Sequence, residues 1–183
     1  MPAELHVVLD ACVLANSSVC DLLLRLAETP RLYLPHWTAK ILEEVDSTHA
    51  KLEWPEYLTK SWRDAADSHF TEAIVEDYEC YLPLANNDPK DHHVLAAAIC
   101  VKAGLIVTFN LRDFDSASLD PFGIKAMHPS EYLITLYEIN SGVVVSKLEA
   151  MARAANSSTE AIVEKLSKSV LAFALHLADA LDW

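Results

Sequence analysis

Short apolar runs alternate with stretches of helical periodicity through the first two thirds of the chain. The runs Leu5–Leu9 and Leu105–Thr108 predict strands that are buried on both faces of a sheet. Apolar residues recur at helical spacing over residues 11–28, over 37–50 and from Asp91 onward. Because strands alternate with helices, we expect an α/β fold in which helices flank a parallel sheet.

The remaining pattern divides the chain into two parts. Leu32–Leu34 and Tyr81–Leu84 predict two further short strands, the second confined to an edge because Pro83 lacks an N–H. From about residue 129 the pattern is helical throughout. We therefore expect an α/β domain over 1–128 and a helical extension over 129–183.

Local sequence signals predict how some of these helices end or begin. Gly104 is expected to terminate the helix that starts at Asp91. Ser157 and Glu160 stand at the spacing of a capping box, which predicts a helix start at Ser157.

Composition narrows the possible functions. The 183 residues carry 27 acidic and 14 basic side chains, a net charge of −13, which disfavours a broad cationic surface for nucleic acid. The 3 glycines lie far apart, which excludes a glycine-rich phosphate loop. No apolar run is long enough to span a membrane and no signal peptide is visible, so we expect a cytoplasmic protein with reduced cysteines.

Polar side chains follow or precede the predicted strands where a parallel sheet binds its ligands. Asp10 follows the first strand, Asp91 opens the helix before the last buried strand, and Asn110 and Asp113 follow that strand. The carboxyl ends of parallel strands meet at one edge, so these side chains are expected to lie together. Each also has an ordinary interpretation, as a helix cap or a turn residue.

A glutamate from the second predicted helix, Glu43 or Glu44, could reach the same edge, although a solvated helix face is the ordinary interpretation of both. Carboxylates a few ångströms apart repel one another, and a divalent cation removes that cost. Oxygen ligands favour Mg²⁺ or Mn²⁺. Such a site is suited to hydrolysis of a phosphodiester.

Four stretches of the chain resemble one family. Residues 8–14, 37–45, 88–98 and 106–114 are similar to a PIN domain of the branch that contains VapC-type ribonuclease toxins, and the resemblance covers about residues 4–138. It implies a PIN-like parallel sheet flanked by helices and a metal-dependent endoribonuclease that leaves a 5′-phosphate and a 3′-hydroxyl. It also implies an RNA substrate, a cognate antitoxin that neutralises the protein, and a homodimer.

The resemblance also implies roles for single residues. The implied ligands of Mg²⁺ or Mn²⁺ are Asp10, Asp91 and Glu44, with Glu43 as the less favoured choice. The variable fourth position of the site corresponds to Asp113 or Asn110, and Thr108 corresponds to the hydroxyl residue that supports the first acid.

The chain departs from many relatives at the mouth of the site. His92 stands where they carry Arg, and Cys20 stands where they carry a basic residue. Lys90 and Arg112 remain as local cations, which either contact phosphates together with His92 or pair with neighbouring acids.

Two alternatives stay open at this point. A non-catalytic PIN-fold module that binds RNA or protein would also explain Asn110 and the scarcity of bases. A phosphatase with Asp10 as covalent nucleophile is disfavoured, because Cys12 stands where such enzymes commonly place a second Asp.

Overall fold

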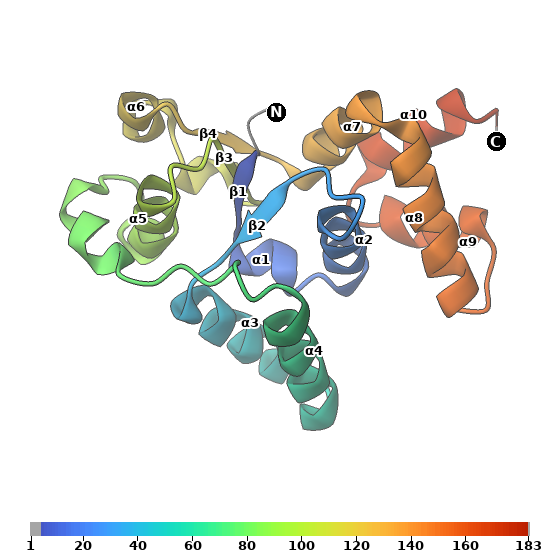
Figure 1. Ribbon diagram of the computed structural model, residues 1–183, viewed down its shortest axis with the longest axis horizontal. Coiled ribbons are helices and arrows are strands. Elements are labelled where there is room, and N and C mark those ends of the chain that lie inside the picture. Colours follow the sequence, from blue (N-terminus) through green and yellow to red (C-terminus); the bar gives the residue numbers. More distant parts are fainter. Residues whose placement is uncertain (1–4, 183) are drawn as a thin grey trace. The chain divides into compact units, whose positions relative to one another are not determined.

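A computed structural model describes residues 5–182, and within them the strands form a four-stranded parallel sheet in the order β2-β1-β3-β4 (Figure 1). The strands are β1 (His6–Leu9), β2 (Leu34–His36), β3 (Leu105–Val107) and β4 (Lys125–Met127). Helices flank this sheet, so the α/β fold class that the apolar runs predict is confirmed.

The helices account for most of the described residues. Their bounds are α1 Ala11–Leu14, α2 Ser17–Ala27, α3 Ala39–Lys51, α4 Glu56–His69, α5 His92–Cys100, α6 Ser116–Leu119, α7 Pro129–Ile139, α8 Ser141–Ala154, α9 Thr159–Ser167 and α10 Leu171–Ala180. Short 3₁₀ helices occupy Tyr78–Leu84 (η1), Pro89–Asp91 (η2), Leu111–Asp113 (η3) and Asp120–Phe122 (η4).

The register of the two central strands places the candidate site. Leu9 of β1 is paired with Val107 of β3, and both side chains are fully buried. The next residue on each strand, Asp10 and Thr108, therefore emerges at the same edge of the sheet. The backbone N–H of Asp10 also donates to the carbonyl of Val107 at 3.1 Å, which ties the two strand ends together.

The chain divides into two compact units. The sheet unit comprises residues 1–15 and 34–127, and the helical unit comprises 16–33 and 128–183. Helix α2 therefore groups with the helices that follow residue 128. The expected nuclease domain over 1–128 and extension over 129–183 stay a prediction, although the residues from Pro129 onward are helical as expected.

The helical unit is held by apolar packing around a few paired polar groups. Tyr132 packs edge-on against Tyr33 with ring centroids 5.4 Å apart, and Phe173 is fully buried. The hydroxyl oxygen of Ser130 accepts a hydrogen bond of 2.9 Å from the backbone N–H of Phe173, which satisfies an N–H at the start of α10.

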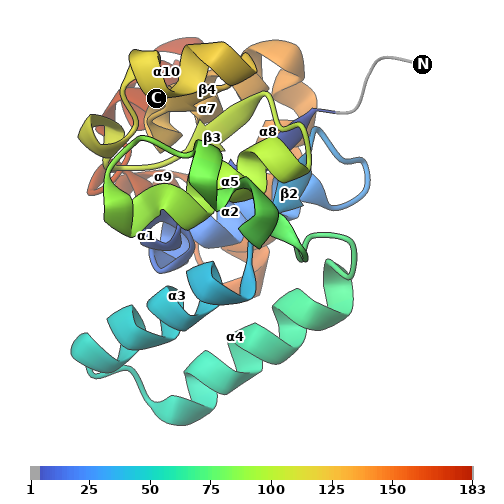
Figure 2. The ribbon, with the colours of Figure 1, turned by 90° about the vertical axis from the view of Figure 1, so that its left-hand side faces the viewer.

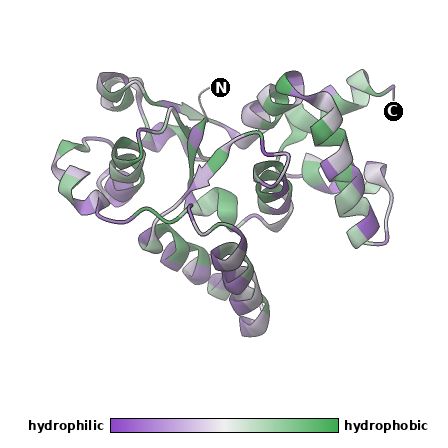
Figure 3. Cartoon of the chain, in the orientation of Figure 1, coloured by the Kyte–Doolittle hydropathy of each residue, from purple (hydrophilic) through white to green (hydrophobic). Residues whose placement is uncertain are grey.

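In the sheet unit, α3 and α4 form an antiparallel pair (Figure 2). Ala66 is the buried residue of α4, and the rest of that helix is partly or fully exposed. The ribbon coloured by hydropathy is accordingly mostly hydrophilic along α4 and hydrophobic along the central strands (Figure 3). Within residues 5–182, no helix is both long and apolar enough to cross a membrane.

Several local predictions are wrong. The segment Tyr81–Leu84 is the end of the 3₁₀ helix η1, because Pro83 cannot donate to a strand ladder. The second strand lies at Leu34–His36 rather than Leu32–Leu34. Helix α9 begins after Ser158, whose hydroxyl caps Ala161, rather than after Ser157.

The ends of two helical segments also differ from those that the sequence predicts. Helix α5 ends at Cys100, before Gly104, and Lys102 takes the left-handed backbone conformation. The apolar stretch 11–28 is two helices, because Asn16 caps a new one with its side chain. The edge strand β4 was not predicted, because its three residues are too few to show the alternation of apolar and polar positions that indicates a strand.

Candidate metal and phosphate site

Asp10 is buried and held at the carboxyl ends of β1 and β3, with only 4% of its surface exposed. Its Oδ1 accepts a hydrogen bond of 2.7 Å from the backbone N–H of Ala11, so Asp10 caps α1. Its Oδ2 accepts one of 2.7 Å from the hydroxyl of Thr108. Because both oxygens are engaged, the arrangement fits a fixed anion and disfavours a covalent nucleophile.

Thr108 lies beside Asp10 at the end of β3 and hydrogen-bonds to it. It is fully buried, and its hydroxyl oxygen accepts a hydrogen bond of 2.9 Å from the backbone N–H of Asn110 while it donates to Asp10. The strand end, the following turn and Asp10 are thus connected through one hydroxyl group.

Cys12 also contacts Asp10, a contact that the sequence pattern did not indicate. Its thiol donates to Asp10 Oδ2 at 3.2 Å, and the backbone N–H of Phe109 donates to its sulfur at 3.4 Å. Burial, reinforced by the negative charge of Asp10, raises the pKa of the Cys12 thiol to about 12. The thiol therefore keeps its proton at neutral pH and acts as a second donor to Asp10.

Asp91 lies at the start of α5 with 9% of its surface exposed, and its side chain does not cap that helix. Burial, together with the negative charge of Asp10, raises the pKa of Asp91 from its ordinary 3.8 to about 7. Its Oδ2 is buried and has no hydrogen-bond partner among the described residues. An ionised Asp91 is therefore under-neutralised, and a cation in contact with it would remove that cost.

Lys90 and Asp113 complete the charged group. Lys90 Nζ lies 2.9 Å from Asp113 Oδ2, 3.8 Å from Asp91 Oδ2 and 3.9 Å from Asp88 Oδ2. The hydrogen bond to Asp113 is the main cause that raises the pKa of Lys90. We use the name acidic rim for the group formed by Asp10, Asp91, Thr108, Asp113 and Lys90.

Glu44 lies on α3 and its side chain is one-third exposed. Its Oε1 is 3.4 Å from Nε2 of His93, a residue in the first turn of α5. Its neighbour Glu43 is exposed and lies 3.8 Å from Lys40. Glu44 therefore reaches the first turn of α5, which follows Asp91, through its contact with His93.

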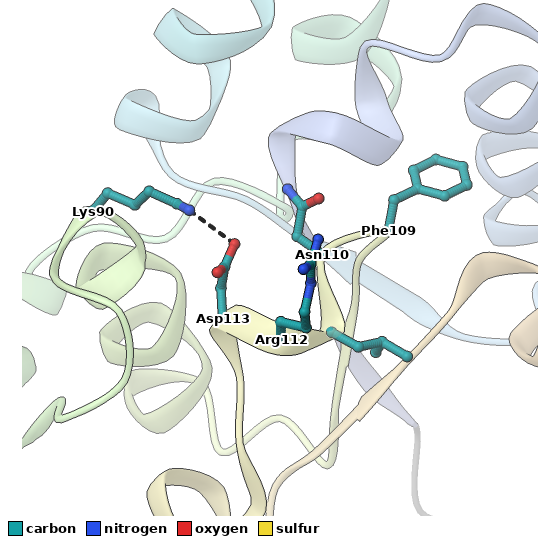
Figure 4. A pocket seen from close by; sticks show the side chains of 6 residues that line it. Lys90, Phe109, Asn110, Arg112 and Asp113 are labelled. Atoms are coloured by element: carbon teal, nitrogen blue, oxygen red, sulfur yellow. Dashed lines mark hydrogen bonds and ion pairs between the residues drawn. The ribbon is translucent and has the colours of Figure 1, made fainter.

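A pocket of about 360 Å³ opens beside the acidic rim (Figure 4). Its lining residues are Lys90, Phe109, Asn110, Leu111, Arg112 and Asp113. In Figure 4 the side chains of Asn110 and Arg112 point the same way, whereas the ring of Phe109 points elsewhere. Lys90 reaches across to Asp113 at the side of the pocket.

The three candidate phosphate-binding residues therefore differ in their availability. Arg112 is exposed, and no ion pair within residues 5–182 involves it. Lys90 is bound to the acids of the rim. His92 is half-buried with Nε2 3.0 Å from the carbonyl oxygen of Asn87, so it supports the turn before α5.

The donor set of the acidic rim fits a divalent cation in its chemistry. The available atoms are carboxylate oxygens, which suit Mg²⁺ or Mn²⁺, and the buried Oδ2 of Asp91 is one of them. Among residues 5–182, however, no three His, Cys, Asp or Glu side chains already stand together as a metal-ligating group. Asp10 is the acid whose charge acts most strongly on Asp91, so these two carboxylates are the candidate pair of ligands.

A curated protein is similar to part of this chain. The chain is 38% identical over 101 residues to "Putative ribonuclease VapC50" of Mycobacterium tuberculosis (strain ATCC 25618 / H37Rv). The aligned segment covers 52% of this chain and 59% of that protein. The chain thus spans less than two thirds of the relative's length. No protein-family model and no solved structure matches the chain. The similarity to a VapC protein confirms the resemblance that the four motif stretches predict.

Proposed function

We propose that this protein is an endoribonuclease of the VapC type that uses Mg²⁺ or Mn²⁺ at the acidic rim. The observation that carries the proposal is the buried, unpartnered Oδ2 of Asp91 beside the fixed carboxylate of Asp10, at the carboxyl ends of two parallel strands. Similarity to a protein named as a ribonuclease supports RNA as the substrate.

Asp10 and Asp91 would hold the cation, and Glu44 or Asp113 would complete its shell directly or through water. When bound, the ion would supply acidification of a water molecule and stabilisation of the charge that develops on the phosphate oxygens. A cation at this point also gives an acidic protein a local attraction for a phosphodiester.

The protein's own residues perform the positioning. Thr108, Cys12 and the N–H of Ala11 fix both oxygens of Asp10, so little reorganisation is needed when the site is used. Arg112 at the mouth of the pocket would bind a phosphate oxygen of the RNA. Asn110 lines the same pocket and would contact the neighbouring nucleotide.

The partners follow from the same proposal. An antitoxin that neutralises this protein would present a basic or apolar segment to the acidic rim, because complementary charge favours that pairing. A homodimer is part of the proposal as well.

RNA cleavage by the purified protein tests the proposed reaction. A pool of structured RNAs is incubated with Mg²⁺, with Mg²⁺ and excess chelator, and with the variants Asp10→Asn and Asp91→Asn. We expect cleavage that the chelator abolishes and that each variant lowers by at least about 100-fold. The variant Asp67→Asn is the matched control, because Asp67 is an exposed acid of α4.

Two results would contradict the proposal in different ways. Cleavage that survives the chelator and both variants would remove the metal site. RNA binding without any cleavage, unchanged in Asp91→Asn, would favour the non-catalytic PIN-fold module. That alternative has one observation in its favour, namely that residues 5–182 contain no assembled group of three ligands.

A further inference from the structure

Lys90 occupies an unusual position for a surface lysine. Its ammonium nitrogen lies within 4 Å of three carboxylates, at 2.9 Å from Asp113, 3.8 Å from Asp91 and 3.9 Å from Asp88. Most of its side chain is exposed, at 61%. An exposed lysine usually forms one loose pair of small energetic value, whereas this one is the cation nearest to several acids at once.

The contact with Asp91 bears directly on the metal site. The oxygen that Lys90 approaches is Oδ2 of Asp91, the buried oxygen without a hydrogen-bond partner. At 3.8 Å the ammonium is close enough for strong attraction and too far for a hydrogen bond. Lys90 therefore partly neutralises the same oxygen that a divalent ion would bind.

The exposed position of Lys90 leaves room for the side chain to be displaced. Its hydrogen bond to Asp113 lies at the side of the pocket, and the flexible lysine stem is in solvent (Figure 4). Asp113 and Asp91 are much less exposed, with side-chain exposures of 18% and 12%. A cation that enters would thus displace the lysine rather than the acids.

On this basis, and on the proposed metal-dependent function, we propose that Lys90 is a built-in counter-cation that competes with the divalent ion for Asp91 and Asp113. Its positive charge stabilises the acidic rim while no metal is bound, and it weakens the binding of the metal. Lys90 thereby lowers the affinity of the site for its cation without binding the cation itself.

The alternative role for Lys90 predicts the opposite change in metal affinity. If Lys90 were a clamp that arranges Asp113 and Asp91 for the metal, removal of its charge would weaken metal binding. If it competes with the metal, removal of its charge strengthens binding. The two roles are separated by one measurement on one variant.

The experiment measures Mn²⁺ binding by titration calorimetry and by the electron paramagnetic resonance signal of free Mn²⁺, without RNA. Lys90→Met keeps the length of the side chain and removes the charge. We expect it to bind Mn²⁺ about 3- to 10-fold more tightly than the wild type. Lys90→Arg keeps the charge and is expected to bind within about twofold of the wild type.

A matched control accounts for the change in net charge. Lys40→Met also removes one positive charge, from an exposed lysine of α3 that lies 3.8 Å from Glu43. It is expected to leave Mn²⁺ affinity unchanged. Adding Lys90→Met to Asp113→Asn is expected to have a smaller effect than adding it to the wild type, because the shared acid is gone.

The outcomes distinguish this inference from the proposed function. Mn²⁺ binding that Asp91→Asn abolishes, but that Lys90→Met leaves unchanged or weakens, overturns the role of Lys90 and leaves the metal site standing. Mn²⁺ binding that Asp91→Asn does not affect overturns the metal site and this inference with it. Tighter binding in Lys90→Met together with absent RNA cleavage supports this inference and counts against the ribonuclease.

Discussion

The acidic rim and the helical unit bury polar groups in opposite ways. In the helical unit, Ser130 accepts a hydrogen bond from the N–H of Phe173, and the buried group without a partner, the hydroxyl of Tyr132, is neutral. Burial raises the pKa of Tyr132, so that hydroxyl stays uncharged. In the acidic rim, the unpartnered atom is a carboxylate oxygen of Asp91.

This difference separates a region built for stability from one prepared for a ligand. A neutral unpaired hydroxyl costs far less free energy than an unpaired charge in the same surroundings. Carboxylates held together without full neutralisation lower the stability of the rim, and that cost is recovered when a cation binds. We therefore expect substitutions in the apolar core of the helical unit to change stability more than substitutions in the acidic rim.

Truncation of the apolar core of the helical unit should have the largest effect on stability. Phe173 is fully buried, so Phe173→Ala loses the burial of an aromatic ring and leaves a cavity. We expect a loss of about 3–5 kcal/mol in the free energy of unfolding, measured by urea denaturation. Leu175→Ala on the same helix is the control, because Leu175 is 61% exposed; an equal loss there would contradict the assignment of the core.

Removal of the hydroxyl that supports Asp10 should cost less. Thr108→Val keeps the shape of the side chain and leaves Asp10 Oδ2 and the N–H of Asn110 without the hydroxyl. We expect a loss of about 1.5–3 kcal/mol in stability, because the lost hydrogen bond involves a charged acceptor. Thr135→Val, whose hydroxyl donates to the carbonyl of Glu131 at an exposed site, should change stability by less than about 1 kcal/mol.

Neutralisation of Asp91 should raise stability while it removes activity. In metal-free protein at pH 8, Asp91→Asn replaces an under-neutralised carboxylate by a neutral amide, and we expect a gain of about 1–2 kcal/mol. The gain is measured by denaturation in the presence of chelator, with Asp67→Asn as the control. A loss of stability would show that the ionised Asp91 is already fully compensated in the metal-free protein.

A buried histidine of the sheet should give the smallest effect, seen as a dependence on pH. Burial, with the neighbouring His6, lowers the pKa of His36 from 6.5 to about 4. In the unfolded chain His36 is protonated below about pH 6.5, whereas in the folded protein it is protonated only below about pH 4. The free energy of unfolding therefore falls as the pH is lowered through this window. We expect a loss of about 1 kcal/mol between pH 7.5 and pH 5.5.

The variant that tests this dependence is His36→Gln, which should flatten the curve over the same range. His69→Gln, at an exposed position on α4, should leave the curve unchanged. An unaltered slope in His36→Gln would show that another group titrates in this window.

Much of the fold follows from pattern alone, and the exceptions have physical causes. The buried strand β1 and helices α3 and α5 are predicted because each carries an apolar surface of the right period. The strand predicted at Tyr81–Leu84 failed, because an apolar run broken by a proline has no period that separates strand from 3₁₀ helix. Strand β4 was missed, because its three residues form a strand only through pairing with β3.

The α/β class, the acidic balance and the identity of the candidate residues can be inferred from the sequence, because periodicity and residue chemistry are local properties. Folding, in contrast, sets which of these acids lie close together. It joined Asp10 to Thr108, put Lys90 between Asp113 and Asp91, and left Glu44 beside His93. Such contacts depend on strand register and on how far each charge is removed from water, and neither quantity is written in the spacing of residues along the chain.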